Sequence, residues 1–450
     1  MNYKELKQKL IATQNDEFYD VVIHIGSPKT GSSALQKFLV NNDDNLIESG
    51  FYYPKHGLDQ NGISAGHIEV SVPMLLGNLD KARKKFLEYI SEAKEQKKTL
   101  LLSSESFYAN AENLVYITNG FRCKIICFFR DPLDAVFSNY NQGVKRHSYI
   151  NTVSQYISEV IQSDLSYYNG KIFEEWENLF GKENLFIFGY DPKVFKVIGI
   201  EEFFMTIIGI SEDKISSLKP KSSKYINKSY TLAALELKRI LNFVIEKDNM
   251  YILNRELDWF LQKVSDKNEK VPHISNMLDE TLLSRLNHSF KESNQNMKDK
   301  YLYNLNAEFL TTNKKLEVEI SRFEILTNIL TLINSLKENK PELYHYIKKQ
   351  TTEIIKSMQP GHDVLKLCEW LDIAVFDTSS ICIWFNQQQI NYISDNGSTK
   401  ADLLRELAKL FVQKNDYPNA YQIIQEAIHL KPNAPGIIKL HKDISRQLGL

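Results

Sequence analysis

The sequence predicts an α/β fold with a parallel sheet flanked by helices, followed by an all-α C-terminal region. Two observations support this prediction. In the first half of the chain, short apolar runs alternate with amphipathic stretches, which is typical of parallel strands buried on both faces. From residue 228 onward, the pattern changes to one amphipathic helix after another.

Four apolar runs are predicted to be strands, at Val21–Ile25, Thr99–Ser103, Cys123–Phe129 and Asn184–Phe188. The stretches between them are predicted to contain helices at Ser32–Val40, Ala82–Lys97 and Pro132–Asn141. In a parallel sheet, ligands bind just beyond the carboxyl ends of the strands. We therefore expect the functional loops to follow the first three strands.

The C-terminal region, residues 309–450, is predicted to form a helical domain, with Ser380–Phe385 as a candidate strand. Within residues 401–450, two helices joined at Asn415–Tyr417 resemble a tetratricopeptide (TPR) unit. An ordinary helical hairpin produces the same pattern, so both interpretations stay open. The region is a candidate surface for a protein partner or for self-association.

The composition excludes several classes of protein. Lys and Arg total 55 and Asp and Glu total 56, so the net charge of −1 argues against a nucleic-acid binder. The four cysteines are too few for a disulfide scaffold, and no zinc site is expected at Cys123 and Cys127. The chain has neither a signal-peptide h-region nor an apolar run of about 18 residues. We expect a cytoplasmic protein, and attachment to the periphery of the inner membrane stays open.

The loop after the first strand has the residues of an anion-binding site. Segment 23–36 reads IHIGSPKTGSSALQ, in which small residues let backbone N–H groups approach an anion and the next helix adds its positive end. Ser32 or Ser33 is expected to cap the helix or to donate a hydroxyl. The spacing matches neither GxxxxGKS/T nor GxGxxG, so neither an ordinary nucleotide-triphosphatase loop nor a dinucleotide site is predicted. A plain strand-to-helix turn is the alternative.

A second candidate anion contact follows the third strand. Arg130 stands at the end of this strand and Ser138 comes eight residues later, so a guanidinium and a hydroxyl are able to meet at one phosphate. The alternative is a surface ion pair of Arg130 with Asp131 or Asp134.

Together the two motifs resemble those of sulfotransferases that use 3′-phosphoadenylyl sulfate (PAPS), most closely the bacterial and Golgi-type carbohydrate branch. The resemblance implies a P-loop-like fold and a catalytic domain over residues 1–308, ending in a helical tail at Ser289–Leu302. It implies that Lys29 contacts the transferring sulfuryl group and the leaving phosphate oxygen, and that Arg130 and Ser138 bind the 3′-phosphate. The residues of the implied 5′-phosphosulfate loop are Pro28, Lys29, Thr30, Gly31, Ser32 and Ser33.

The glycine-rich lysine motif of cytosolic sulfotransferases is absent. In its region, the segment Lys219–Lys228 has four lysines in ten residues, and Lys221 and Lys224 are candidates for a lid over the 3′-phosphate. A solvated basic linker is the alternative.

Glu105 and His67 are the leading candidates for the general base. Glu105 follows the second strand, and the carbohydrate branch has a glutamate after the matching strand as its base. A partly desolvated carboxylate there would have a raised pKa. A first-turn acid of a helix is the alternative. Cytosolic sulfotransferases use a histidine, although no local motif transfers that role to His67, and His56 is a weaker third candidate.

The resemblance implies transfer of a sulfuryl group from PAPS to a hydroxyl or amine of a carbohydrate or glycoconjugate, with 3′,5′-adenosine bisphosphate (PAP) as product and no metal. The cluster Lys145–His147 would meet an anionic acceptor or stabilise the carboxyl end of a helix. Two alternatives stay open: a nucleotide-phosphate kinase with a degenerate P-loop, and a non-catalytic helical interaction protein with a nucleotide-binding domain.

Overall fold

The computed structural model describes residues 3–12, 18–27, 29–57, 64, 66–218, 229–245, 251–267, 277–278, 280–302, 308–310, 322–357, 361–374, 397–414 and 416–448. The chain divides into two compact units, Met1–Ile354 and Ile355–Leu450. The predicted division into a catalytic domain over residues 1–308 and a helical domain over residues 309–450 stays a prediction.

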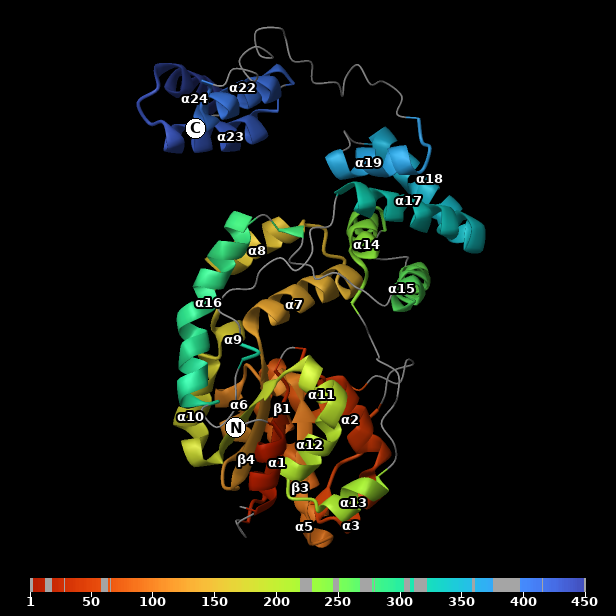
Figure 1. The fold of residues 1–450 in the computed structure, drawn as a ribbon, viewed down its shortest axis with the longest axis vertical. Coiled ribbons are helices and arrows are strands. Elements are labelled where there is room, and N and C mark those ends of the chain that lie inside the picture. The colour runs from red at the N-terminus through yellow and green to blue at the C-terminus, as the bar shows by residue number, and fades with distance from the viewer. Residues whose placement is uncertain are drawn as a thin grey trace. The chain divides into compact units, whose positions relative to one another are not determined.

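A parallel sheet forms the centre of the first unit (Figure 1). Its strands are β1 (Val21–Ile25), β2 (Phe51–Tyr52), β3 (Thr99–Ser104), β4 (Cys123–Arg130) and β5 (Leu185–Tyr190). The order is β2-β3-β1-β4-β5, and every neighbouring pair is parallel. The loops after β3, β1 and β4 therefore lie next to one another at one edge of the sheet. The predicted fold class, a P-loop-like parallel sheet followed by helices, is confirmed.

The four predicted strands are present with small differences at their ends. β1 has the predicted bounds, β3 and β4 each continue one residue further, and β5 lies slightly later in the chain. The edge strand β2 is not among the strands predicted from the sequence. A strand of two residues shows no periodicity, so only its pairing with β3 reveals it.

The helices and 3₁₀ turns of the first unit follow the strands in the usual alternation. They are α1 (Tyr3–Ala12), α2 (Ser32–Asn41), α3 (Asp43–Glu48), α4 (Ile68–Leu75), α5 (Leu79–Glu95), η1 (Glu105–Phe107), α6 (Ala111–Thr118), α7 (Pro132–Arg146), α8 (Val153–Gln162), α9 (Ser166–Asn169), α10 (Ile172–Phe180), η2 (Lys182–Asn184), α11 (Pro192–Ile198), α12 (Ile200–Ile207), α13 (Glu212–Ser217), α14 (Leu232–Val244), α15 (Tyr251–Asp266), α16 (Glu280–Lys300), α17 (Arg322–Asn339) and α18 (Pro341–Ser357).

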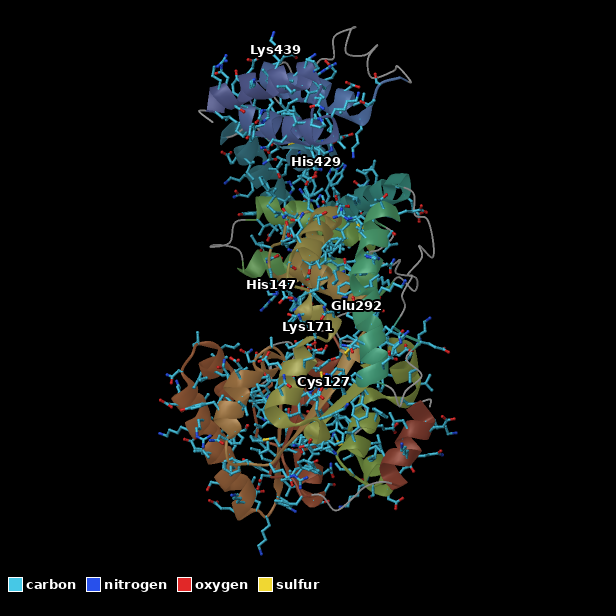
Figure 2. The ribbon with its side chains drawn as sticks, turned by 90° about the vertical axis from the view of Figure 1, so that its left-hand side faces the viewer. Cys127, His147, Lys171, Glu292, His429 and Lys439 are labelled. Atoms are coloured by element: carbon cyan, nitrogen blue, oxygen red, sulfur yellow. The ribbon has the colours of Figure 1, made fainter. Side chains whose placement is uncertain are left out.

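Helices cover both faces of the sheet, as the side chains of β4 demonstrate. Phe128 contacts Phe195 of α11, with ring centroids 5.7 Å apart, whereas its neighbour Phe129 contacts Phe173 of α10 at 5.8 Å. Successive residues of a strand point to opposite faces, so α11 and α10 lie on opposite sides of the sheet. Cys127, labelled in Figure 2, is fully buried in the same core.

The second unit contains α19 (His362–Trp370), α22 (Lys400–Gln413), α23 (Tyr417–Leu430) and α24 (Pro435–Leu448). Small and β-branched side chains, among them Ala408, Ala420 and Ile424, form the core of α22–α24. The two helices expected there are present, and their TPR character stays a prediction. The candidate strand Ser380–Phe385 lies outside the described residues. Among the helices that the structure describes, none is long and apolar enough to cross a membrane.

Gly66 tests the close packing at the carboxyl edge of the sheet. Its φ is +74°, and an added Cβ would lie 2.2 Å from the carbonyl oxygen of Ser103. We expect Gly66→Ala to lower the free energy of unfolding by roughly 2–4 kcal/mol, because strain and overpacking act together. Chemical denaturation measures this difference. The control is Gly57→Ala, whose added Cβ meets nothing within 4 Å, and equal losses of stability in the two variants would contradict the prediction.

Candidate active site

The loop between β1 and α2 forms an open turn that leaves backbone N–H groups at the start of α2 for a ligand. Lys29 and Gly31 both have left-handed backbones, with φ of 60° and 81°. The hydroxyl of the buried Thr30 donates to the carbonyl of Ser27 at 2.9 Å, which closes the turn. Gly31 is the N-cap of α2 and supplies no side-chain cap, contrary to the expected capping by Ser32 or Ser33. The first N–H groups of the helix are therefore able to bind an anion.

Gly26 brings this loop into contact with Glu105. A Cβ at position 26 would lie 2.7 Å from Ser32 Oγ and 2.8 Å from Glu105 Cγ. The backbone of Gly26 also donates to the carbonyl of Ser104 at 3.2 Å. The start of α2 and the residue after β3 therefore meet across a glycine that has no room for a side chain.

Lys29 lies between the loop and helix α7. Its ammonium donates to Gln142 Oε1 on α7. Burial lowers the pKa of Lys29, and the charges of Arg130 and Arg146 lower it further, whereas the carboxylate of Glu105 acts in the opposite direction. A cation held in this partly desolvated position is suited to stabilising a negative charge that develops nearby.

Arg130 connects the two motifs found in the sequence. Its guanidinium donates to the backbone carbonyl of Lys29 at 3.0 Å. Its distance to the Asp134 carboxylate is 3.9 Å, which makes that ion pair a loose one. The guanidinium carbon also lies 5.9 Å from the ring centre of Tyr190 at the end of β5. The end of β4 therefore supports the loop after β1 directly.

Ser138 lies on the side of α7 that faces this loop. Asp134, Ser138 and Gln142 are spaced four residues apart and share one helix face. Asp134 lies near Arg130 at one end of the face, and Gln142 bonds Lys29 at the other. The helix geometry therefore places Ser138 between the two cations.

Glu105 opens the 3₁₀ turn directly after β3. Burial raises the pKa of its carboxyl group, while the charge of Lys29 and a contact with Ser32 lower it. The residue as a whole is exposed, while its carboxyl group is desolvated enough for burial to raise its pKa. This is the raised pKa expected from the sequence, and a raised pKa makes the carboxylate a stronger proton acceptor.

His67 lies fully buried beside the end of β3. The backbone N–H of Ser103 donates to its Nδ1 at 3.0 Å, and its Nε2 lies 3.2 Å from the carbonyl oxygen of Pro54. Burial lowers the pKa of His67 to about 3. Both ring nitrogens thus bond the backbone and hold the strand that leads to Glu105. His56 bonds the hydroxyl of Tyr53 at 2.9 Å.

Three candidate residues, Pro28, Lys221 and Lys224, lie outside the described residues. Two residues of the cluster at the end of α7 contact the helical region. Lys145 donates to Gln262 at 2.5 Å, and Arg146 pairs with Asp258 at 2.9 Å. His147, labelled in Figure 2, is exposed.

The sequence analysis missed Gln142 and Tyr190. Tyr190 packs against Gly31, where an added Cβ would lie 3.6 Å from its hydroxyl. The signal for Tyr190 was its place after a predicted strand. The signal for Gln142 was its spacing from Ser138 on a helix that continues to Arg146, beyond the predicted end.

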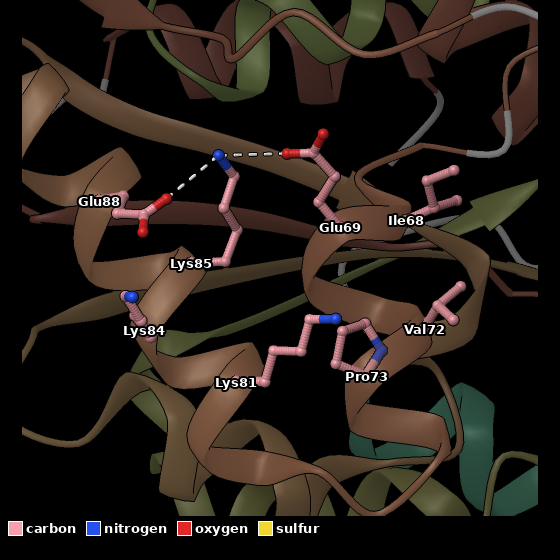
Figure 3. Close-up of a pocket in the computed structure, with 8 residues that line it drawn as sticks. All are labelled: Ile68, Glu69, Val72, Pro73, Lys81, Lys84, Lys85 and Glu88. Carbon is pink, nitrogen blue, oxygen red and sulfur yellow. Dashed lines mark ion pairs between the residues drawn. The ribbon is translucent and has the colours of Figure 1, made fainter.

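A groove of about 590 Å³ lies elsewhere, between α4 and α5 (Figure 3). Lys85 pairs across it with Glu69 at 3.2 Å and with Glu88 at 3.3 Å. Its lining includes no residue of the loops after β1, β3 and β4, so it is separate from the candidate site. Within the described part of the chain, no group of His, Cys, Asp and Glu side chains is arranged to hold a metal ion.

The parallel sheet with an anion-binding loop after β1 defines a P-loop-like α/β protein. Residues 19–192 match the family model of the sulfotransferase domain. The chain therefore contains a sulfotransferase domain, whose general activity is sulfuryl transfer to an acceptor. A sulfotransferase from Alicyclobacillus acidocaldarius is similar in structure, with a TM-score of 0.39 and 11% identity over 66% of this chain and 100% of that chain. No curated protein matches the sequence.

The bond from Arg130 to the Lys29 carbonyl predicts how the loop responds to mutation. We expect Arg130→Gln to reduce the hydrogen-exchange protection of amides 29–33 by about tenfold or more, because a charged hydrogen bond is lost. Exchange followed by mass spectrometry or NMR measures this. Asp134→Asn removes the loose ion pair and keeps the bond from Arg130 to the Lys29 carbonyl, so the protection should stay close to that of the wild type. Equal protection in Arg130→Gln and wild type would show that the bond does not hold the loop.

Proposed function

We propose that the protein transfers a sulfuryl group from PAPS to a hydroxyl or amine of a carbohydrate or glycoconjugate. The observation that carries the proposal is the hydrogen bond between Arg130 and the carbonyl of Lys29. It joins, at one edge of the sheet, the two motifs that the sulfotransferase resemblance assigns to opposite ends of the same nucleotide. The match of residues 19–192 to the sulfotransferase domain supports the same reaction.

Each motif has its own part of the donor to bind. The loop residues Thr30, Gly31, Ser32 and Ser33 would hold the 5′-phosphate through backbone N–H groups and hydroxyls at the start of α2. Arg130 and Ser138 would bind the 3′-phosphate, since a guanidinium and a hydroxyl offer several donors to one anion. The roles of Pro28, Lys221 and Lys224 rest on the sequence resemblance alone.

PAPS supplies an activated sulfuryl group whose bond to the phosphate oxygen breaks as the acceptor oxygen or nitrogen bonds to sulfur. Lys29 stabilises the negative charge that grows on the leaving phosphate oxygen. Glu105 takes the proton that the acceptor loses, and the protonated carboxyl group later returns it to water. Such a reaction depends on the positioning of the reactants and on electrostatic stabilisation. Lys29 and Arg130 already offset negative charges of the donor, so no metal is needed for that purpose.

Glu105 fits the role of base better than His67. Glu105 is an exposed residue, and burial of its carboxyl group raises its pKa. Both ring nitrogens of His67 are bonded to the backbone, and its low pKa keeps it neutral and poorly basic. We assign His67 a structural role beside the base.

The proposed acceptor class follows from the resemblance to the carbohydrate branch, and the proposed location is the cytoplasm. The helices of residues 309–450 are a candidate surface for a protein partner or for self-association, with a TPR-like pair at α22 and α23. A kinase with a degenerate P-loop is the competing function. The loop argues against it because Lys29 follows Pro28, where the GxxxxGKS/T motif has a glycine.

Nucleotide binding separates the two enzyme classes. We expect isothermal calorimetry to show PAP binding at least tenfold more tightly than ATP, without a magnesium requirement, because Arg130 and Ser138 contact a 3′-phosphate that ATP lacks. Ser138→Ala should weaken PAP binding and leave ATP binding unchanged. Tighter binding of ATP, dependent on magnesium, would favour the kinase.

Removal of the base should abolish transfer without affecting the donor. Glu105→Gln is expected to reduce turnover by roughly 10²–10⁴-fold at unchanged PAP affinity. In the wild type, kcat/KM should fall as the pH drops through the raised pKa of Glu105, above the usual range of carboxylates.

The charge of Lys29 lowers the pKa of Glu105, so its removal should move this acid limb to higher pH. We expect Lys29→Ala to show that shift together with a roughly 10²–10³-fold loss of turnover.

A Glu105→Gln variant with normal turnover would exclude the carboxylate as base.

A further inference from the structure

One face of α7 is polar and yet turned into the protein. Asp134, Ser138, Asn141 and Lys145 follow one another at the spacing of a single helix face. Asn141 is 3% exposed and Lys145 is 6% exposed. Asp134 and Ser138 on the same face are only half-buried. Burying a polar group without a hydrogen-bond partner costs free energy, so the two buried side chains need partners.

Asn141 has an unused donor on this face. Its side-chain Nδ2 is buried and makes no hydrogen bond to any residue that the structure describes. Buried amide donors are almost always satisfied, because leaving one without an acceptor costs about 1–3 kcal/mol. An oxygen of a bound ligand would satisfy it.

Lys145 lies one turn beyond Asn141, where α7 meets the helices α14 and α15. Its ammonium donates to Gln262 Oε1 at 2.5 Å and lies 4.4 Å from the centre of the Tyr230 ring. Lys238 of α14 is a second buried ammonium in this region, and burial lowers the pKa of both lysines to about 8. Asp258 pairs with Arg146 at 2.9 Å, and its charge also raises the pKa of Lys145 against the effect of burial.

The helical wall around Lys145 is attached firmly to α7. Asn242 of α14 donates to the carbonyls of Val144 at 2.8 Å and Tyr149 at 3.1 Å. Arg239 of the same helix donates to the carbonyl of Ile150 at 2.7 Å. These bonds satisfy carbonyls at and beyond the end of α7, and they keep the positive side chains of both helices close together.

We propose that Asn141 and Lys145 form a second anion subsite that binds a negatively charged group of the acceptor. The inference rests on the proposed function, since it takes Ser138 and Lys29 as the donor side. At 1.5 Å per residue, Lys145 lies about 10 Å along the helix from Ser138, so one phosphate cannot contact both. Gln142, which bonds Lys29, lies between them. The acceptor would therefore carry its charge a short distance from the group that becomes sulfated.

Calorimetry on the full chain saturated with PAP tests this subsite. The probes are a hyaluronan tetrasaccharide, which carries carboxylates, and the neutral tetramer of N-acetylglucosamine. We expect the acidic probe to bind about tenfold or more tightly than the neutral one. Lys145→Gln and Asn141→Leu should remove most of this preference, while PAP affinity and the melting temperature stay near the wild-type values.

The matched control is Lys84→Gln, which removes an exposed lysine on α5 far along the chain from this face and should keep the preference. Equal binding of both probes by the wild type, or a preference that survives in Lys145→Gln and Asn141→Leu, would overturn the subsite. A drop in PAP affinity in Asn141→Leu as large as that in Ser138→Ala would reassign Asn141 to the donor. If the wild type does not bind PAP at all, the proposed function itself fails, which is a different result from the loss of the preference.

Discussion

The hydrogen bond from the Arg130 guanidinium to the carbonyl of Lys29 is the contact on which the candidate site depends. A carbonyl in a left-handed turn points away from the regular paths of a strand or a helix, so the backbone cannot satisfy it locally. An arginine at the end of the neighbouring strand supplies the missing donor. Because β1 and β4 are adjacent and parallel, this arrangement needs no distortion of either strand.

Opposite pKa changes follow from the same geometry. Lys29 and Glu105 lie close enough to influence each other, and burial disfavours the charged form of both. Each charge therefore partly offsets the desolvation of the other. An anionic donor entering beside Lys29 would strengthen the ammonium form of the lysine. The same anion would raise the proton affinity of Glu105, which is what a base needs at the moment of transfer.

Helix α7 extends the site beyond the sheet. Its first turn, capped by Asp131, lies at Arg130, and its last turn is held by α14 and α15. A single rigid helix thus connects the donor side with a helical wall in the same compact unit. Rigidity matters here because transfer requires donor and acceptor groups to be aligned within a few tenths of an ångström.

Local patterns in the sequence, namely apolar runs, small residues and positions after strands, predict the order of strands and helices. They also predict the anion-binding loop and identify Lys29 and Arg130 as candidate site residues. Local patterns do not predict the burial of His67, the contact of Lys29 with Gln142 or the unused amide donor of Asn141. Each of these depends on side chains that are distant in the sequence. The edge strand β2 is likewise recognised only from its pairing with β3. Which residues follow the predicted strands can be read from the amino-acid sequence, since the apolar runs that mark strands are local. Which of these residues are buried, charged or hydrogen-bonded depends on the folded chain, because burial and electrostatics arise from all the groups packed around a side chain.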